Sequence, residues 1–187
     1  IKDILAIGLS PFLLNTALCV IIILINKGLK EFGGDLSVGA YGIVNRVTFF
    51  FTMIVMGITQ GMQPIVSYNY GARQFSRVTE ALKKAIILAI ITLSIGCLIG
   101  ETIPRFVCRL FTTDNELLNY SVDGMRIVMS TFPIISLPIV IGNFFQSIGK
   151  AKKSIVLSLS RQVLFLIPLL LTLPKFIGIR GVWWSIP

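Results

Sequence analysis

The sequence contains no histidine, and only 13% of its 187 residues are charged. Without histidine, the chain lacks imidazole catalysis, imidazole metal ligands and the side chain that normally titrates near neutral pH. A soluble domain carries about 25% charged residues. This chain therefore has too little charge to cover the surface of a water-soluble globule of its size.

The sequence also lacks the motifs of nucleotide-binding proteins and hydrolases. It has three cysteines, whose spacing fits neither a metal site nor a disulfide framework. It has no Walker loop, no glycine-rich nucleotide fingerprint and no nucleophile motif of a hydrolase. We therefore predict that the protein is not an enzyme and has no metal site and no cofactor.

Apolar residues, by contrast, make up 55% of the chain and form long blocks. The first block has no charge and is long enough to cross about 30 Å of hydrocarbon as a helix. We predict an all-α integral membrane protein, with residues 1–187 forming one transmembrane domain. Five spans are expected, with a sixth beginning near residue 181 and truncated: 4–26, 38–68, 85–106, 124–148 and 154–173.

The segments between the blocks carry turn and capping signals. Three glycines and four charges in Lys27–Ser37 predict a linker. Thr113 and Glu116 have the spacing of a capping box, which predicts a helix starting near Asp114. The Trp183–Trp184 pair is typical of the membrane–water interface. Because the sequence begins at Ile1 without methionine, we expect it to start partway through a longer protein.

The net charge of +9 comes from basic residues between the apolar blocks. Such residues set membrane topology and meet anionic lipid head groups. No basic-aromatic platform for a nucleic acid is present, so we expect none as a partner. The connections around Lys2, 69–84 and 150–153 form the more compact basic group, and we predict that they face the cytoplasm. This predicts a multi-pass protein of the cytoplasmic membrane, from a prokaryote.

Polar side chains inside apolar spans are costly in lipid and should face protein or water. Amides there either bond between helices or line a substrate path, and an arginine can instead extend to the nearer interface. The predicted substrate-cavity residues are Asn15, Gln60, Asn143, Gln146 and Arg161.

Prolines and small residues recur within the blocks. Pro64, Pro133 and Pro168 predict helix kinks, which are either ordinary bends or hinges of a transporter. Two G-x-x-x-G patterns, Gly57–Gly61 and Gly96–Gly100, are expected to let helices approach closely.

One stretch resembles a known family signature. Residues 57–74, Gly-Ile-Thr-Gln-Gly-Met-Gln-Pro-Ile-Val-Ser-Tyr-Asn-Tyr-Gly-Ala-Arg-Gln, resemble the signature of the multidrug and toxic compound extrusion family, and residues 145–154 agree with it. The resemblance implies twelve helices in two lobes, of which this chain would supply helices seven to eleven and the start of twelve. The missing N-terminal lobe and membrane lipid would be its partners.

The resemblance also implies a function. It implies export of organic cations or drug-like molecules by antiport against H⁺ or Na⁺, with alternating access between the lobes. Family members place the coupling carboxylate in either lobe. Here the first and fourth spans carry no internal acid, which favours a proton site in the N-terminal lobe.

Two alternatives remain at this point. One is a flippase for lipid-linked oligosaccharides of the same wider fold, for which Arg46 and Arg161 would provide cationic groups. The other is a membrane scaffold that transports nothing.

Overall fold

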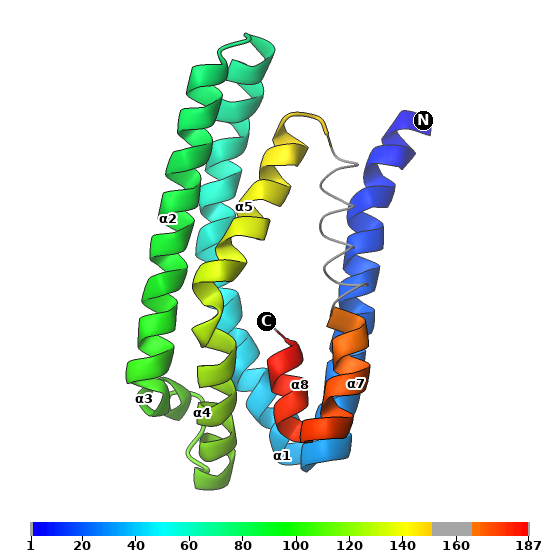
Figure 1. Ribbon diagram of the computed structural model, residues 1–187, viewed down its shortest axis with the longest axis vertical. Coiled ribbons are helices and arrows are strands. Elements are labelled where there is room, and N and C mark those ends of the chain that lie inside the picture. The colour runs from blue at the N-terminus through cyan, green and yellow to red at the C-terminus, as the bar shows by residue number, and fades with distance from the viewer. Residues whose placement is uncertain (1, 151–165, 187) are drawn as a thin grey trace.

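The computed structural model describes residues 2–150 and 166–186, with side chains from Asn15 onward. This described part is almost entirely helical and contains no strand (Figure 1). The helices are α1 (Lys2–Gly71), α2 (Phe75–Thr102), α3 (Pro104–Arg109), α4 (Asn115–Ser130), α5 (Phe132–Ser147), α7 (Ile167–Ile177) and α8 (Ile179–Ser185). The predicted all-α membrane fold is confirmed.

Helix α1 is a hairpin of two helical halves that meet at Gly34. Gly34 has φ 70° and ψ −172°, a conformation that a residue with a Cβ rarely adopts. The hydroxyl of Ser37 donates to the Gly33 carbonyl oxygen at 2.7 Å, and Lys30 pairs with Asp35 at 3.4 Å. The predicted linker over 27–37 is therefore wrong, because this segment has no proline and stays helical on both sides of one glycine.

The connections alternate between the two ends of the molecule. The N-terminus, the turn from α1 to α2 and the end of α5 lie at one end in Figure 1. Gly34, α3 and the connection from α7 to α8 lie at the other end. Lys2, the connection 69–84 and Lys150, which are the described parts of the three basic connections, therefore share one end, which we call the basic end.

Two helical stretches in the described residues are long and apolar enough to cross a membrane: Asn15–Gly71, with 57 residues, and Phe75–Thr102, with 28. Helices α4 and α5 would make a third crossing together, with a bend of 55° between them. The first two predicted spans both fall in α1. Much of the predicted span 154–173 lies outside the described residues, so the five-span boundaries stay a prediction.

The start of α4 is capped as the sequence suggests, but by a neighbouring residue. The helix begins at Asn115, and the side chain of Asp114 accepts a hydrogen bond from the Glu116 backbone N–H at 2.9 Å. Thr112 in turn accepts from the Asp114 backbone N–H at 3.2 Å. Asp114, rather than Thr113, is the cap, because its carboxylate satisfies a helix-end donor.

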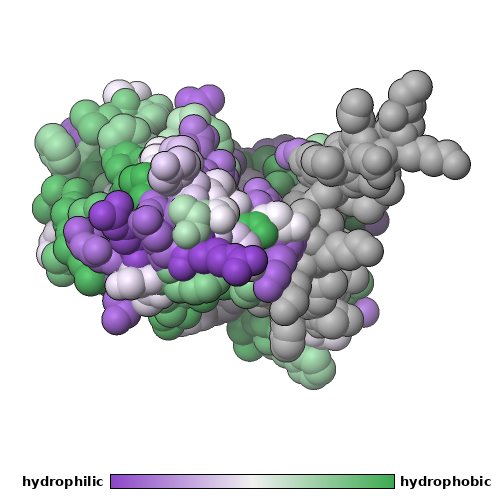
Figure 2. All heavy atoms as spheres, turned by 90° about the horizontal axis from the view of Figure 1, so that it is seen from above, coloured by the Kyte–Doolittle hydropathy of each residue, from purple (hydrophilic) through white to green (hydrophobic). Residues whose placement is uncertain are grey.

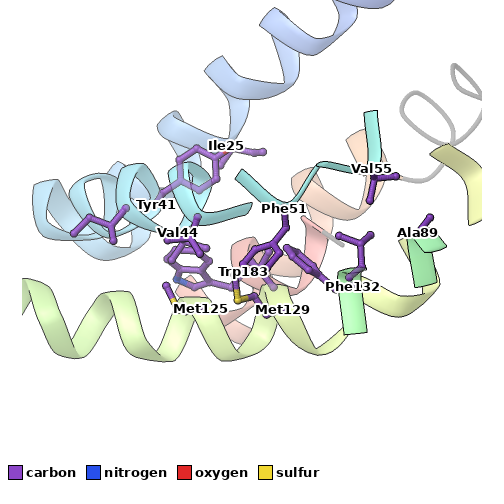
Figure 3. Packing of buried hydrophobic residues seen from close by; sticks show 14 of the residues in the cluster. Ile25, Tyr41, Val44, Phe51, Val55, Ala89, Met125, Met129, Phe132 and Trp183 are labelled. Atoms are coloured by element: carbon purple, nitrogen blue, oxygen red, sulfur yellow. The ribbon is translucent and has the colours of Figure 1, made fainter. Parts of the chain in front are cut away.

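Trp183 of α8 packs into the centre of the bundle. It is 3% exposed, its ring centroid lies 6.3 Å from that of Tyr41, and Figure 3 shows it between α1 and the methionines of α4. A Cβ added to Gly124 would collide with this indole. The interface prediction is therefore wrong for Trp183, whereas Trp184 is 50% exposed.

The two G-x-x-x-G patterns have different surroundings. A Cβ on Gly96 would lie 3.1 Å from the Phe51 ring, and one on Gly100 would collide with Met129. The second pattern therefore allows the close packing expected of it. A Cβ added at Gly57 or Gly61 would meet nothing within 4 Å, so close packing within the described part does not explain the first pattern.

Much of the outside of the bundle is apolar. Large apolar side chains are exposed all along it, including Ile23 at 65%, Phe50 at 62% and Leu98 at 63%. Seen from the basic end in Figure 2, hydrophilic residues gather over that end and hydrophobic ones lie around the flanks. This arrangement fits a protein whose sides face lipid or another lobe.

We predict that Gly100→Leu destabilises the protein by about 1–3 kcal/mol, because the new side chain overfills the contact with Met129. The thermal unfolding midpoint of the detergent-purified full-length protein measures this. Gly42→Leu is the matched control, because a Cβ at Gly42 meets nothing within 4 Å. Equal midpoints for the two variants would contradict the packing argument.

Candidate functional site

A pair of side-chain hydrogen bonds joins the second half of α1 to α5. The Gln63 amide nitrogen donates to Asn143 Oδ1 at 3.3 Å. The Ser67 hydroxyl donates to the Ser147 carbonyl oxygen at 2.7 Å. We call these four residues, Gln63, Ser67, Asn143 and Ser147, the polar seam.

Helix geometry sets the spacing of the polar seam. On each helix the two residues are four apart, so they lie one above the other on the same face. The Asn143 amide nitrogen also donates to the Ile139 carbonyl oxygen at 2.9 Å, and the Ser147 hydroxyl donates to the Asn143 carbonyl oxygen at 2.8 Å. These local bonds fix the orientation of the α5 side chains at the contact with α1.

Two further predicted cavity residues flank the polar seam. Gln60 lies three residues before Gln63, and Gln146 lies three residues after Asn143. Both are exposed, whereas Gln63 and Asn143 are half-buried. Amides thus extend from the contact between the helices out to the accessible surface near the basic end.

Gln63 was missing from the predicted cavity residues, although its side chain donates a hydrogen bond to one of them, Asn143. Its signal was the spacing to Gln60, which puts both amides on adjoining turns of one helix. The sequence gives no indication of its partner, which is 80 residues away.

The remaining predicted cavity residues lie elsewhere. Asn15 is exposed on the first half of α1, which stands apart from α5 in Figure 1. Arg161 lies outside the described residues. Arg46, considered for an anionic substrate, is exposed on the second half of α1.

The three hinge candidates occupy different positions in their helices. Pro133 lies in the first turn of α5, next to the 55° bend between α4 and α5. Pro64 lies within α1, where Gly34 is the residue with non-helical backbone angles. Pro168 lies in the first turn of α7. Their role as hinges stays a prediction.

A cavity of about 350 Å³ lies between α4 and α8, near the end opposite the polar seam. Its charged lining consists of Asp123, Arg126 and Arg180, beside Tyr120, Trp183 and Trp184. The two arginines give it a net positive lining, which disfavours a cation. The described residues hold no group of three or more His, Cys, Asp or Glu side chains that could bind a metal.

Comparison with known proteins gives one family. The MatE family model matches residues 7–172. The multidrug export protein MepA of Staphylococcus aureus (strain MSSA476) is 25% identical over all 187 residues of this chain. That match covers 41% of MepA, so the chain spans less than half the length of such relatives.

Solved structures share the fold. A structure described as the MATE multidrug transporter DinF-BH in complex with a ligand has a TM-score of 0.81 and 42% identity, over 96% of this chain and 40% of that one. An inward-facing MATE transporter of the MOP superfamily has a TM-score of 0.89 at 21% identity, over 99% of this chain and 43% of that one. The helical architecture and the extended family match agree, and this chain belongs to the MatE family of membrane transporters.

Proposed function

We propose that the full-length protein exports drug-like organic cations across the cytoplasmic membrane by antiport against H⁺ or Na⁺. The observation that carries this proposal is family membership over most of the chain, with a solved relative at 42% identity that is described as a multidrug transporter in complex with a ligand. MepA, described as a multidrug export protein, supports the same substrate class. The activity is transport without chemical conversion of the substrate.

We propose that this chain forms part of one wall of the transport cavity. Half-buried Asn143 and the exposed Gln60 and Gln146 present amide groups near the basic end. Amides bind a cation or a polar drug atom through their carbonyl oxygen without placing a fixed charge in the membrane. The missing N-terminal lobe would provide the opposite wall, and relative motion of the lobes would alternate access.

The coupling group belongs, in this proposal, to the part of the protein that the chain does not include. Asp123 shares its cavity with Arg126 and Arg180, which repel a coupling cation. Glu101 lies exposed near the end of α2, away from the polar seam. An acid in the N-terminal lobe is then the expected site for the ion, with H⁺ favoured.

The first test is transport by the full-length protein in liposomes. We expect uptake of a fluorescent organic cation when a proton gradient is imposed, and little or none with a sodium gradient alone. Uptake driven by the sodium gradient would mean that Na⁺ is the coupling ion, and it would still support transport by antiport. If neither gradient moves any of several cations, the drug-export proposal fails for this protein, and lipid-linked oligosaccharides become the substrates to test.

We predict that Asn143→Leu lowers the cation transport rate roughly three- to twentyfold, which corresponds to a loss of about 0.6–1.7 kcal/mol of stabilisation in the rate-limiting step of transport, the size of one interhelical hydrogen bond. The cause is loss of both the Gln63 contact and the amide at the cavity wall. Initial rates at equal reconstituted protein measure this effect.

Asn119→Leu is the control for Asn143→Leu. Asn119 is an exposed amide on α4, near the opposite end of the molecule from the polar seam. Its replacement should leave the transport rate unchanged. Unchanged export of every substrate by Asn143→Leu would remove Asn143 from the cavity.

A further inference from the structure

A groove runs between α2 and the second half of α1 at the basic end. It consists of two hollows of about 300 and 350 Å³ that share Ile65, Ala81 and Lys84, so they adjoin. These volumes are at the lower end of the range for small-molecule sites. The hollow nearer the tip of the helices is lined by Asn69, Arg77 and Glu80 as well, and the other by Gly57, Ile58, Gly61, Met62, Ala85 and Leu88.

A buried polar atom borders the hollow nearer the tip. Asn69 is only 7% exposed, and its Oδ1 has no hydrogen-bond partner among the described residues. The Asn69 amide nitrogen donates to the Ile65 carbonyl oxygen at 2.8 Å, which fixes the amide orientation. A buried acceptor without a partner is costly. The Asn69 oxygen is therefore an unsatisfied acceptor at the edge of this hollow.

The other hollow is apolar and open. No described side chain would meet a Cβ on Gly57 or Gly61 within 4 Å, although the same spacing at Gly96 and Gly100 is tightly packed. Leu88 borders this hollow and is 50% exposed. The two glycines thus leave room along the side of the bundle that a slender apolar chain can fill.

The charges at the groove favour an anion. Arg77 and Lys84 carry two positive charges and Glu80 one negative charge, which leaves a net charge of +1. The Lys84 ammonium lies 2.7 Å from the Glu80 carboxylate and keeps further N–H donors for a ligand. Cationic groups just outside an apolar groove match a phosphate above an acyl chain.

We propose that this groove binds one anionic phospholipid with a hydroxylated head group, of the phosphatidylglycerol class. Arg77 and Lys84 hold its phosphate, a head-group hydroxyl donates to Asn69 Oδ1, and an acyl chain lies along Gly57 and Gly61. The site is separate from the polar seam, where Gln63 contacts α5 on another face of the same helix. It does not depend on what the transporter exports.

The experiment measures lipid binding to the delipidated full-length protein by native mass spectrometry. Short-chain phosphatidylglycerol is the probe, with phosphatidylethanolamine and phosphatidylcholine as comparisons. We expect one phosphatidylglycerol to bind roughly tenfold more tightly than either, because it carries a net negative charge whereas the other two lipids are zwitterionic, and each lysine or arginine near anionic lipid contributes about 1 kcal/mol.

Two pairs of variants test the groove itself. Arg77→Gln with Lys84→Gln should weaken phosphatidylglycerol binding roughly tenfold or more. Arg73→Gln with Lys83→Gln removes the same charge from exposed residues at the same end that do not line the groove, and should leave binding nearly unchanged. Gly61→Leu should also weaken binding by filling the acyl position, whereas Gly42→Leu should not.

The proposal is overturned by any of three results. Equal weakening by both charge pairs would mean that general surface charge attracts the lipid. Equal binding of the three lipids would mean that the groove does not select an anion. No bound lipid on the wild-type protein would mean that the missing lobe or water fills the groove. None of these results bears on drug export, which the liposome experiment tests separately.

Discussion

Inside a bilayer no water is available to bond a free backbone N–H or C=O group, so the chain must satisfy these groups itself. This requirement accounts for the helical content of the described residues and for how the helices end. After α2, the Ile103 N–H donates to the Ile99 carbonyl oxygen at 3.0 Å, and after α7 the Gly178 N–H donates to the Pro174 carbonyl oxygen at 2.9 Å. These two breaks are therefore bonded to the turn before them.

Once the backbone is satisfied, side-chain size and polarity decide how the helices meet. Gly96, Gly100 and Gly124 admit the bulky side chains of Phe51, Met129 and Trp183, which gives a dense core (Figure 3). The polar seam lies at a different contact, between α1 and α5, where hydrogen bonds rather than close packing join the two helices. The described part of the chain thus combines close packing around the glycines with a hydrogen-bonded contact between α1 and α5.

Much of this architecture could be predicted from the sequence. Long uncharged blocks predicted the membrane helices, and the acidic residue at Asp114 lay within one position of the predicted cap. The helical conformation of residues 27–37 could not be predicted, because polar residues at a membrane surface favour helix as readily as loop and the turn depends on the positive φ of Gly34 alone. The burial of Trp183 could not be predicted either, because the space for its ring is provided by Gly124, which is distant in the sequence.

The candidate site was predicted only in part. Amides in apolar spans indicated polar surfaces, and Asn143 does make an interhelical hydrogen bond. The pairing with Gln63 depends on which faces of two distant helices meet, and hydropathy carries no such information. The same limit applies to the groove, because Gly57–Gly61 and Gly96–Gly100 have the same pattern and opposite surroundings.

The turn at Gly34 has a mechanical consequence. The preceding half of α1 begins at Lys2 and is a rod about 48 Å long, at about 1.5 Å per residue. Because a single glycine joins it to the second half, its tilt depends on the Gly34 backbone angles together with the packing of the buried Ile21, Ile25 and Leu29. A rotation of about 10° there displaces the far tip by up to about 8 Å, on the basis of the same rise per residue. A small rotation at the turn is thereby magnified at the far end of the rod.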